Sequence, residues 1–240
     1  MQSKRTRLDR FMSRQLGMKR QAIRPILAQG RIHVDGCVAT DMQQTIHQFS
    51  HVIFDQQILQ NNQPNYVMFY KPKGVICATR DPHHTTIIDT LGPVLLGADE
   101  TSQLHIAGRL DFNSTGLVLL TNDGSWSRRL CTPANKVEKC YRVELQKPVD
   151  DSYIKAFSQG MYFEYEDITT QPVKLKIIDS HSVEVSLIEG RYHQIKRMFG
   201  RFQNKVLQLH RLSIGNLDLD SKLQPGQGRR LNSEEAEIIF

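Results

Sequence analysis

One carboxylate in the sequence lies where a loop could hold it over a cleft. Asp111 follows Gly108 and Arg109 and comes just before an apolar run at 116–121. A loop that leads into a strand can fix a side chain rigidly, so Asp111 is a candidate catalytic residue. The alternative is an aspartate that makes only a local hydrogen bond in a turn, and composition alone favours that alternative.

Two neighbouring segments are interpreted as structure rather than chemistry. Asn122-Asp123-Gly124 predicts a turn that leads into a helix capped by Ser125. The segment that contains Tyr141 alternates like a strand, which places Tyr141 on one face with Val143 and Leu145. Core packing is therefore the default role of this tyrosine.

A basic segment with aromatic neighbours occupies 189–199 and opens a predicted helix. Such a mixture suits backbone phosphates and stacked bases, although a solvated basic helix would look similar. His193 and His210 have no carboxylate or cysteine at metal-ligand spacing, so no metal site is predicted. The basic side chains of this cluster are Arg191, Lys196, Arg197 and Arg201.

The elements expected around these residues are those of an α+β domain. Strands that follow one another in sequence, with short helices between them, favour a mostly antiparallel mixed sheet flanked by short helices. No Gly-rich nucleotide-binding sequence is present, so no nucleotide cofactor is predicted. The expected strands are 66–70, 116–121, 139–146, 173–178, 182–188 and 206–214, and the expected helices are 125–130, 150–159 and 192–202.

The first quarter of the chain concentrates positive charge. Residues 1–60 hold nine Lys or Arg against four Asp, whereas the other 180 residues carry 22 basic and 21 acidic groups. This distribution is typical of a small nucleic-acid-binding module, although a solvated arginine-rich helix face would look the same. The spacing predicts one helix that Gly17 ends, a second over 20–29 that contains Pro25, and a hairpin turn at Asp35-Gly36.

Length and composition bound the class of protein. The 240 residues are 39% hydrophobic and 23% charged, a globular mixture. No run approaches the ~18 apolar residues of a membrane span, and the N-terminus lacks the apolar region of a secretory signal. The four cysteines form no C-x-x-C pair, which is typical of a protein of the reducing cytoplasm. A polar stretch that ends near Pro64 predicts an N-terminal domain at 1–58, a linker at 59–65 and a second domain at 66–240.

Three segments taken together resemble one family. They are Gly-Arg-Leu-Asp at 108–111 with the Gly-Leu-Val-Leu-Leu-Thr-Asn-Asp-Gly run at 116–124, Tyr-Arg-Val at 141–143, and Glu-Gly-Arg-Tyr-His-Gln-Ile-Lys-Arg-Met-Phe at 189–199. The combination closely resembles the pseudouridine synthases, and residues 5–48 resemble the S4 RNA-binding module. Within the family, the chain is most similar to the branch that carries an N-terminal S4 module and modifies small-subunit ribosomal RNA.

The resemblance implies a reaction and residues that perform it. Members of this family break the N1–C1′ bond of a uridine in RNA, turn the detached base and rejoin it through C5, with no cofactor or metal. Asp111 is then the essential carboxylate, Lys196 its basic partner, and Tyr141 the side chain that stacks on the target base. Arg109 would fill the RNA stack when the target base is flipped out, because a base inside a helix cannot otherwise be reached. Leu209 would form the aliphatic floor of the pocket, although core packing explains it equally well.

The remaining implied contacts are basic. They would bind the RNA backbone around the pocket and along the N-terminal helices. In the synthase domain they are Arg191 and Arg197, and in the S4-like module they are Arg7, Arg10, Lys19, Arg20 and Arg24.

The implied substrate is ribosomal RNA, either naked or in a partly assembled small-subunit particle. The target in this branch is conventionally called uridine 516 of 16S RNA, and a monomer is expected. Two alternatives remain at this point. One is a synthase acting on 23S ribosomal RNA or transfer RNA, and the other is a ribosome-associated S4-type protein without catalysis.

Overall fold

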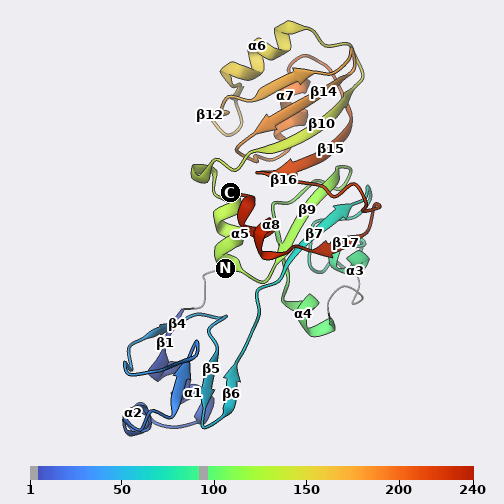
Figure 1. The fold of residues 1–240 in the computed structure, drawn as a ribbon. Coiled ribbons are helices and arrows are strands. Elements are labelled where there is room, and N and C mark those ends of the chain that lie inside the picture. Colours follow the sequence, from blue (N-terminus) through green and yellow to red (C-terminus); the bar gives the residue numbers. More distant parts are fainter. Residues whose placement is uncertain (1–4, 92–96) are drawn as a thin grey trace. The chain divides into compact units, whose positions relative to one another are not determined.

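The computed structural model describes residues 5–91 and 97–240, and its chain divides into two compact units (Figure 1). The main division falls between Pro64 and Asn65. Among the described residues, no helix is long and apolar enough to cross a membrane. Lys4, one of the nine basic residues of the first quarter, lies outside the described residues.

The N-terminal unit packs two short helices against a small sheet. Its core joins residues of both helices, such as Leu8 and Ile23, to strand residues such as Ile32 and Val52. The helices are α1 (Leu8–Leu16) and α2 (Arg20–Ala28). The strands β2 (Ile32–Val34), β3 (Cys37–Val38), β5 (Val52–Phe54) and β6 (Gln57–Gln60) pair in the order β3-β2-β5-β6, and β1 (Thr6–Arg7) pairs with β4 (Thr45–Ile46).

The backbone preferences of single residues explain where the helices and turns of this unit begin and end, as predicted. Gly17 ends α1 with a φ of 65°, a left-handed conformation that glycine adopts without steric cost. Asp35 and Gly36 have φ values of 51° and 84°, as the predicted two-residue hairpin turn between β2 and β3 requires. Pro25 lies inside α2, where the carbonyl left without its helical hydrogen bond belongs to the exposed Gln21 and can face water.

The second unit is built on a mixed sheet in the order β13-β14-β10-β15-β9-β7-β17, with β16 and β8 added at its sides. As predicted, the sheet is mixed and mostly antiparallel. All its strand pairs are antiparallel except β15 with β9. The six predicted strands correspond to β7 (Tyr66–Lys71), β9 (Thr115–Thr121), β10 (Lys139–Leu145), β13 (Lys174–Ile177), β14 (Ser182–Leu187) and β15 (Val206–Ile214).

Several short elements of the second unit were not predicted, because two to six residues carry too little periodicity to signal a strand or helix. They are β8 (His105–Ala107), β11 (Tyr162–Phe163), β12 (Ile168–Thr169), β16 (Leu217–Asp218), β17 (Gly228–Arg230), α3 (Ile87–Leu91), α4 (Ala98–Gln103) and the 3-10 turn η1 (Pro133–Asn135).

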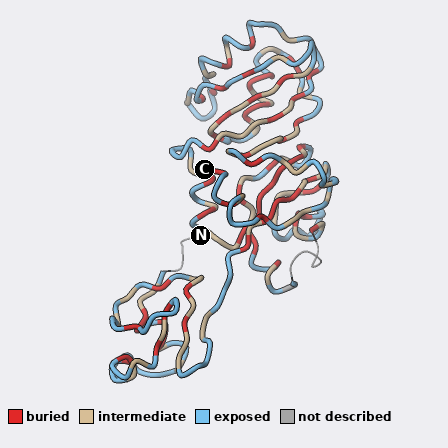
Figure 2. The backbone as a smooth tube through the Cα atoms, viewed as in Figure 1, coloured by how far each residue is buried: buried red, intermediate tan, exposed pale blue. Residues whose placement is uncertain are grey.

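Both faces of the central strands are buried, which explains the continuous apolar run of β9 (Figure 2). Val118 and Leu120 belong to one core, which includes residues of α6 (Asp151–Gln159) and α7 (Gln194–Gly200). Leu117 and Leu119 belong to the other, which α5 (Gly124–Cys131) and Ile239, just after α8 (Ser233–Ile238), complete. The sheet is therefore a rigid platform for side chains at its edges.

The structure corrects three details of the sequence prediction. Ser125 does not cap α5; the Asp123 carboxylate accepts hydrogen bonds from the Ser125 amide and hydroxyl, so Asp123 is the cap. Helix α7 begins at Gln194 instead of residue 192, because His193 has a φ of 49° and cannot continue a right-handed helix. The expected linker at 59–65 begins inside β6, which pairs with β5 as far as Gln60.

Candidate active site

Residues far apart in the sequence line one open pocket of the second unit. Six of the seven synthase-domain residues singled out from the sequence are among them. Asp111 is the single carboxylate among the described residues that line it. The predicted residues at this pocket are Arg109, Asp111, Tyr141, Arg191, Lys196 and Leu209, and they are joined by Leu110, Ser114, Leu187, Gly190, His193, Gln194 and Ile195.

Asp111 is held at both carboxylate oxygens by residues at the start of α7. The Lys196 ammonium donates to Oδ2 over 2.8 Å, and His193 Nε2 lies 3.4 Å from Oδ1. About 30% of each of the Asp111 and Lys196 side chains is exposed, so the pair opens onto the pocket. Two cationic or polar groups on separate oxygens fix the carboxylate plane more firmly than Lys196 alone, which is a point charge and not a fork.

The loop that carries Asp111 is tied from below by a buried lysine. Lys71, the last residue of β7, has no exposed surface, and its ammonium donates to the carbonyls of Pro72 (3.0 Å), Phe112 (3.2 Å) and Ser114 (2.8 Å). Burial lowers the pKa of Lys71 to about 8. The Phe112 and Ser114 carbonyls belong to the backbone just after Asp111. This lysine therefore fixes the course of the loop on the C-terminal side of Asp111.

A buried arginine ties the other side of the same loop. Arg211 on β15 is 2% exposed, and its guanidinium donates to the carbonyls of Leu117 (2.7 Å) and Gly108 (2.6 Å). It also donates to the Tyr141 hydroxyl over 3.3 Å. Arg211 therefore connects the Asp111 loop to the predicted base-stacking tyrosine, and the five donors of its planar group suit this role.

Tyr141 and Leu209 come from neighbouring strands and form the apolar wall of the pocket. As predicted, Tyr141 shares the buried face of β10 with Val143 and Leu145. Both Tyr141 and Leu209 are 8% exposed and belong to the core that α6 and α7 cover. An aromatic ring and an aliphatic side chain on one rigid sheet can contact the faces of a flat base.

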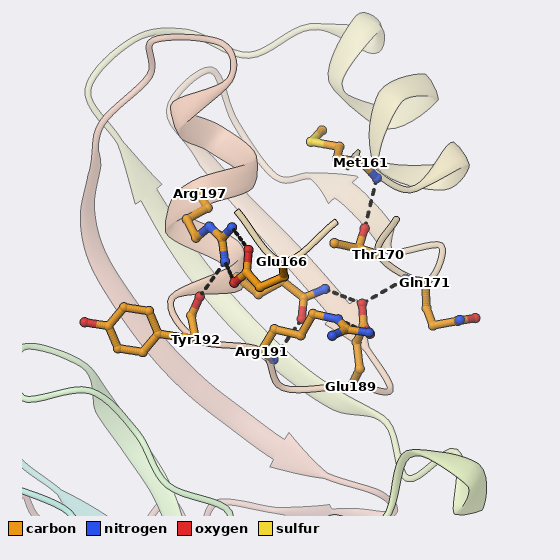
Figure 3. Close-up of polar contacts among 9 residues, drawn as sticks. Met161, Glu166, Thr170, Gln171, Glu189, Arg191, Tyr192 and Arg197 are labelled. Atoms are coloured by element: carbon orange, nitrogen blue, oxygen red, sulfur yellow. Dashed lines mark hydrogen bonds and ion pairs between the residues drawn. The ribbon is translucent and has the colours of Figure 1, made fainter. Parts of the chain in front are cut away.

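A buried carboxylate network supports the loop between β14 and α7 (Figure 3). Glu189 is 4% exposed, and its two oxygens accept hydrogen bonds from the Gln171 amide (2.8 Å), the Gln194 side chain (2.7 Å) and the Arg191 guanidinium (3.0 Å). The Gln194 side chain in turn accepts from the Arg191 amide over 3.1 Å. Arg191 is thereby held at the pocket by a carboxylate that is itself fully hydrogen bonded.

The basic cluster predicted in this segment is not a free basic surface. Besides the Lys196 and Arg191 pairs, Arg197 makes a two-point ion pair with Glu166 at 2.6 Å, and Arg201 lies 3.3 Å from Glu164. Arg197 also stacks over the Phe163 ring and does not line the pocket, so it is the one predicted synthase-domain contact that lies apart. The partner of Arg191, Glu189, lies in the same segment. The other three partner carboxylates, Asp111, Glu164 and Glu166, are distant in sequence, and nothing in the spacing of the segment indicates them.

The basic residues of the N-terminal unit also divide into those that pair with a carboxylate and those that do not. Arg7 is paired with the buried Asp9 at 2.8 Å, which commits it to the structure. Arg31 is likewise paired with Asp55. The four other predicted contacts are exposed and make no ion pair within the described part of the chain; they are Arg10, Lys19, Arg20 and Arg24.

Four residues at the site were not singled out from the sequence: Lys71, His193, Arg211 and Ser114. For Lys71 and Arg211 the sequence carried a signal, namely a charged residue at an inward-facing strand position. Alternation puts Lys71 on the same face of its strand as the buried Phe69, and Arg211 on the same face as the buried Leu209. The hydroxyl of Ser114 is buried and has no partner among the described residues, and its residue lines the pocket. Nothing in the sequence around His193 indicates Asp111, and only folding brings the two together. Within the described residues, no group of three or more His, Cys, Asp or Glu side chains is placed to hold a metal ion.

Comparison with known proteins points to one family. A family model described as RNA pseudouridylate synthase matches residues 65–200. The chain is 46% identical over 230 residues to a ribosomal small subunit pseudouridine synthase A of Pseudomonas aeruginosa, with 95% of this chain and 98% of that protein covered. It is 39% identical over 234 residues to a protein of the same name from Escherichia coli (strain K12), with 97% and 99% covered. A crystal structure of a pseudouridylate synthase superposes with a TM-score of 0.69 at 36% identity, covering 98% of this chain and 99% of that one.

Proposed function

The chain belongs to the RNA pseudouridylate synthase family, and from that premise we propose that it converts a uridine of small-subunit ribosomal RNA to pseudouridine, with Asp111 as the essential carboxylate. The observation that carries the proposal is the Asp111–Lys196 pair, whose members are 85 residues apart in sequence and meet at 2.8 Å inside one pocket. Family membership supports the reaction, and the assembled pocket supports the assignment of residues.

The reaction is an isomerisation, so the pocket has to supply no oxidant and no second substrate. The N1–C1′ bond breaks, a C5–C1′ bond forms, the proton leaves C5, and N1 gains one. A carboxylate can assist by attacking C1′, by attacking the base or by removing a sugar proton, and each route needs an ionised oxygen close to the ribose. The positive charge of Lys196, 2.8 Å away, stabilises the negative charge of the Asp111 carboxylate while the base covers the pocket and excludes water.

The other pocket residues fit the handling of a detached base. The Tyr141 ring supplies a stacking face, and Arg211 fixes its hydroxyl. Leu209 provides an apolar contact beside the Tyr141 ring. A base whose glycosidic bond is broken is then held in the pocket by contacts to its two faces. Arg109 is exposed at the mouth of the pocket, where it can enter the RNA stack as the uridine leaves. Arg191 can contact a phosphate from the opposite loop, and we expect it to contribute less than Arg109 because it already pairs with Glu189.

The small subunit is proposed as the target because both named relatives, which cover nearly the whole chain, are ribosomal small subunit synthases. Uridine 516 of 16S RNA is the specific target we propose, with RNA or a partly assembled particle as the partner, a monomeric enzyme and a cytoplasmic location. The alternatives are 23S ribosomal RNA and transfer RNA. A binding protein without catalysis is disfavoured, since such a protein has no need of the assembled Asp111 site.

The N-terminal unit is proposed to be an S4-like RNA-binding domain. Its exposed Arg10, Lys19, Arg20 and Arg24 have no ion-pair partner within the described residues and can therefore bind phosphates. Arg7 is expected to contribute less, because Asp9 already neutralises it.

Asp111→Asn tests the assignment. We expect no pseudouridine from the purified variant, and an RNA affinity within a few-fold of wild type, because binding is spread over many basic groups. Asp151→Asn, on the exposed first turn of α6, is the matched control and should be fully active. Pseudouridine formation by Asp111→Asn protein would overturn the assignment. Mapping pseudouridine in ribosomal and transfer RNA of cells that lack the protein tests the target: a modification lost outside the small subunit would contradict it.

A further inference from the structure

Tyr192 is a large aromatic side chain left in solvent at a rigidly held position. Its residue is 75% exposed, although it lies between Arg191 and His193, which both line the pocket. Figure 3 shows its ring projecting away from the hydrogen-bonded network around Glu189. An exposed ring of this size contributes little to folding, so its position calls for another explanation.

The backbone on both sides of Tyr192 is anchored. The Tyr192 carbonyl accepts a hydrogen bond from Arg197 over 3.4 Å, and Arg197 is itself held by Glu166. On the other side, the Arg191 amide donates to the buried Gln194 side chain. The ring is thus presented from a fixed support and loses little freedom when it binds a partner.

Tyr192 is also linked to the reacting carboxylate of Asp111 through its neighbour His193. Tyr192 stacks on the His193 ring with centroids 3.9 Å apart and planes inclined by 19°. His193 in turn lies 3.4 Å from the Asp111 carboxylate. One face of Tyr192 is therefore covered by a ring that contacts the catalytic aspartate, and the rest is exposed.

We propose that Tyr192 is a stacking platform for the nucleotide next to the target uridine. The inference rests on the proposed function, which places the target ribose at Asp111 and so brings an adjacent nucleotide to the rim of the pocket. An unpaired base stacks well on an aromatic side chain, and every base offers a suitable face. The exposed guanidinium of Arg109 supplies positive charge that the phosphates beside such a base require.

The test combines a protein variant with a modified RNA. The RNA is a 16S ribosomal RNA fragment that contains the target uridine, prepared intact and with an abasic residue at the 5′ or the 3′ neighbour of that uridine. Single-turnover rates over a range of protein concentrations separate half-saturation from the maximal rate. The proteins are wild type, Tyr192→Leu, Tyr192→Phe, and Tyr165→Leu as a matched control, since Tyr165 is 96% exposed and does not line the pocket.

With intact RNA, Tyr192→Leu should raise the half-saturating concentration roughly 5- to 150-fold, the usual range for the loss of one stacked base. Its maximal rate should stay within about 3-fold of wild type, as expected when binding rather than the transition state is affected. One of the two abasic RNAs should remove the difference between Tyr192→Leu and wild type. Tyr192→Phe and Tyr165→Leu should both behave like wild type.

Three results would overturn the inference. They are unchanged binding by Tyr192→Leu, a binding defect that persists with both abasic RNAs, and a loss confined to the maximal rate, which would mean that Tyr192 only supports His193. If the wild-type protein forms pseudouridine neither in this RNA nor in a partly assembled small-subunit particle, the proposed function fails first, and the inference fails with it.

Discussion

At the scale of single residues, the site is a carboxylate surrounded by positive charge of different kinds. Lys196 contacts Asp111 directly, whereas the buried Lys71 and Arg211 act on the backbone that carries it. Neither buried cation has a carboxylate partner within the described residues. Backbone carbonyl dipoles stabilise the charges of Lys71 and Arg211. These dipoles do not cancel the positive field of the two cations, and that field favours an anion at the Asp111 loop.

Removing the positive charge beside Asp111 should slow the reaction. We expect Lys196→Met to lower the single-turnover rate at neutral pH by roughly 10- to 100-fold, in line with the loss of one charge-assisted hydrogen bond. Lys196→Arg should keep most of the activity, because it keeps the charge. Lys155→Met, at an exposed position of α6, is the control. A fully active Lys196→Met protein would show that Lys196 has no role in the reaction.

The buried Lys71 predicts a pH-dependent stability. Its pKa is about 8 in the folded protein and 10.5 for the unperturbed group, so between these values the unfolded chain binds more protons. The free energy of unfolding of wild type relative to Lys71→Met should therefore rise with pH between ~8 and ~10.5, by up to ~1.4 kcal/mol per pH unit. Urea unfolding of both proteins at several pH values measures this difference. The same comparison with Lys205→Met, an exposed lysine, should be flat, and a flat result for Lys71→Met would contradict the prediction.

At the scale of elements, the Asp111 loop is placed by the junction of β8, β9 and β15. The parallel pairing of β15 with β9 sets Arg211 directly beside Gly116, and this is what lets the Arg211 side chain reach the loop. Gly116 has a φ of 104°, and a Cβ atom there would lie 2.3 Å from the Arg211 carbonyl oxygen. The glycine is required both by its conformation and by this close approach of two backbones.

Gly116→Ala should therefore disrupt the site through the sheet. We expect the free energy of unfolding to fall by more than ~2 kcal/mol, because the backbone must move at a buried strand pair. Activity should fall further than stability alone explains, since Arg211 shifts with the strand. Thermal unfolding and single-turnover assays below the transition measure the two effects. Gly200→Ala, where a Cβ atom meets nothing within 4 Å, is the matched glycine control. Equal stability of the two variants would refute this account of Gly116.

At the scale of the whole molecule, charge and chemistry lie in different units. The first unit has an excess of basic residues and its own core, and the second holds the Asp111 pocket and two further cores. The second unit is nearly neutral in total, and carboxylates of the same unit pair with its basic segment 189–201. Long-range attraction to RNA should therefore come mainly from the first unit.

Removal of residues 1–64 should weaken RNA binding and flatten its dependence on salt. Each lost phosphate contact with single-stranded RNA reduces the slope of log K against log salt by about 0.7. Replacing Arg10, Lys19, Arg20 and Arg24 by Gln in the full chain should reproduce a reduction of up to ~3, with the fold intact by circular dichroism. Arg31→Gln is the control, because Asp55 already pairs with Arg31. An unchanged slope in the fourfold variant would show that these residues are only solvated surface.

The sequence by itself determined the longer elements and the family. Strands such as β10 and β15, the end of α1 at Gly17 and the hairpin at Asp35-Gly36 follow from periodicity and backbone preferences, which neighbouring residues decide. The resemblance of three segments likewise identified the pseudouridine synthases, since each segment is a contiguous run of residues.

Only the tertiary structure decided which charges meet. Lys196 and Arg197 are adjacent in sequence, yet one contacts Asp111 and the other pairs with Glu166, outside the pocket. His193 reaches Asp111 across 82 positions of sequence, and Arg211 reaches Gly108 across 103. Ion pairing depends on distance in space, which the register of the sheet and the packing of α7 set. Residue types and local spacing do not contain that distance, and so a free basic helix and a neutralised one look alike until the chain is folded.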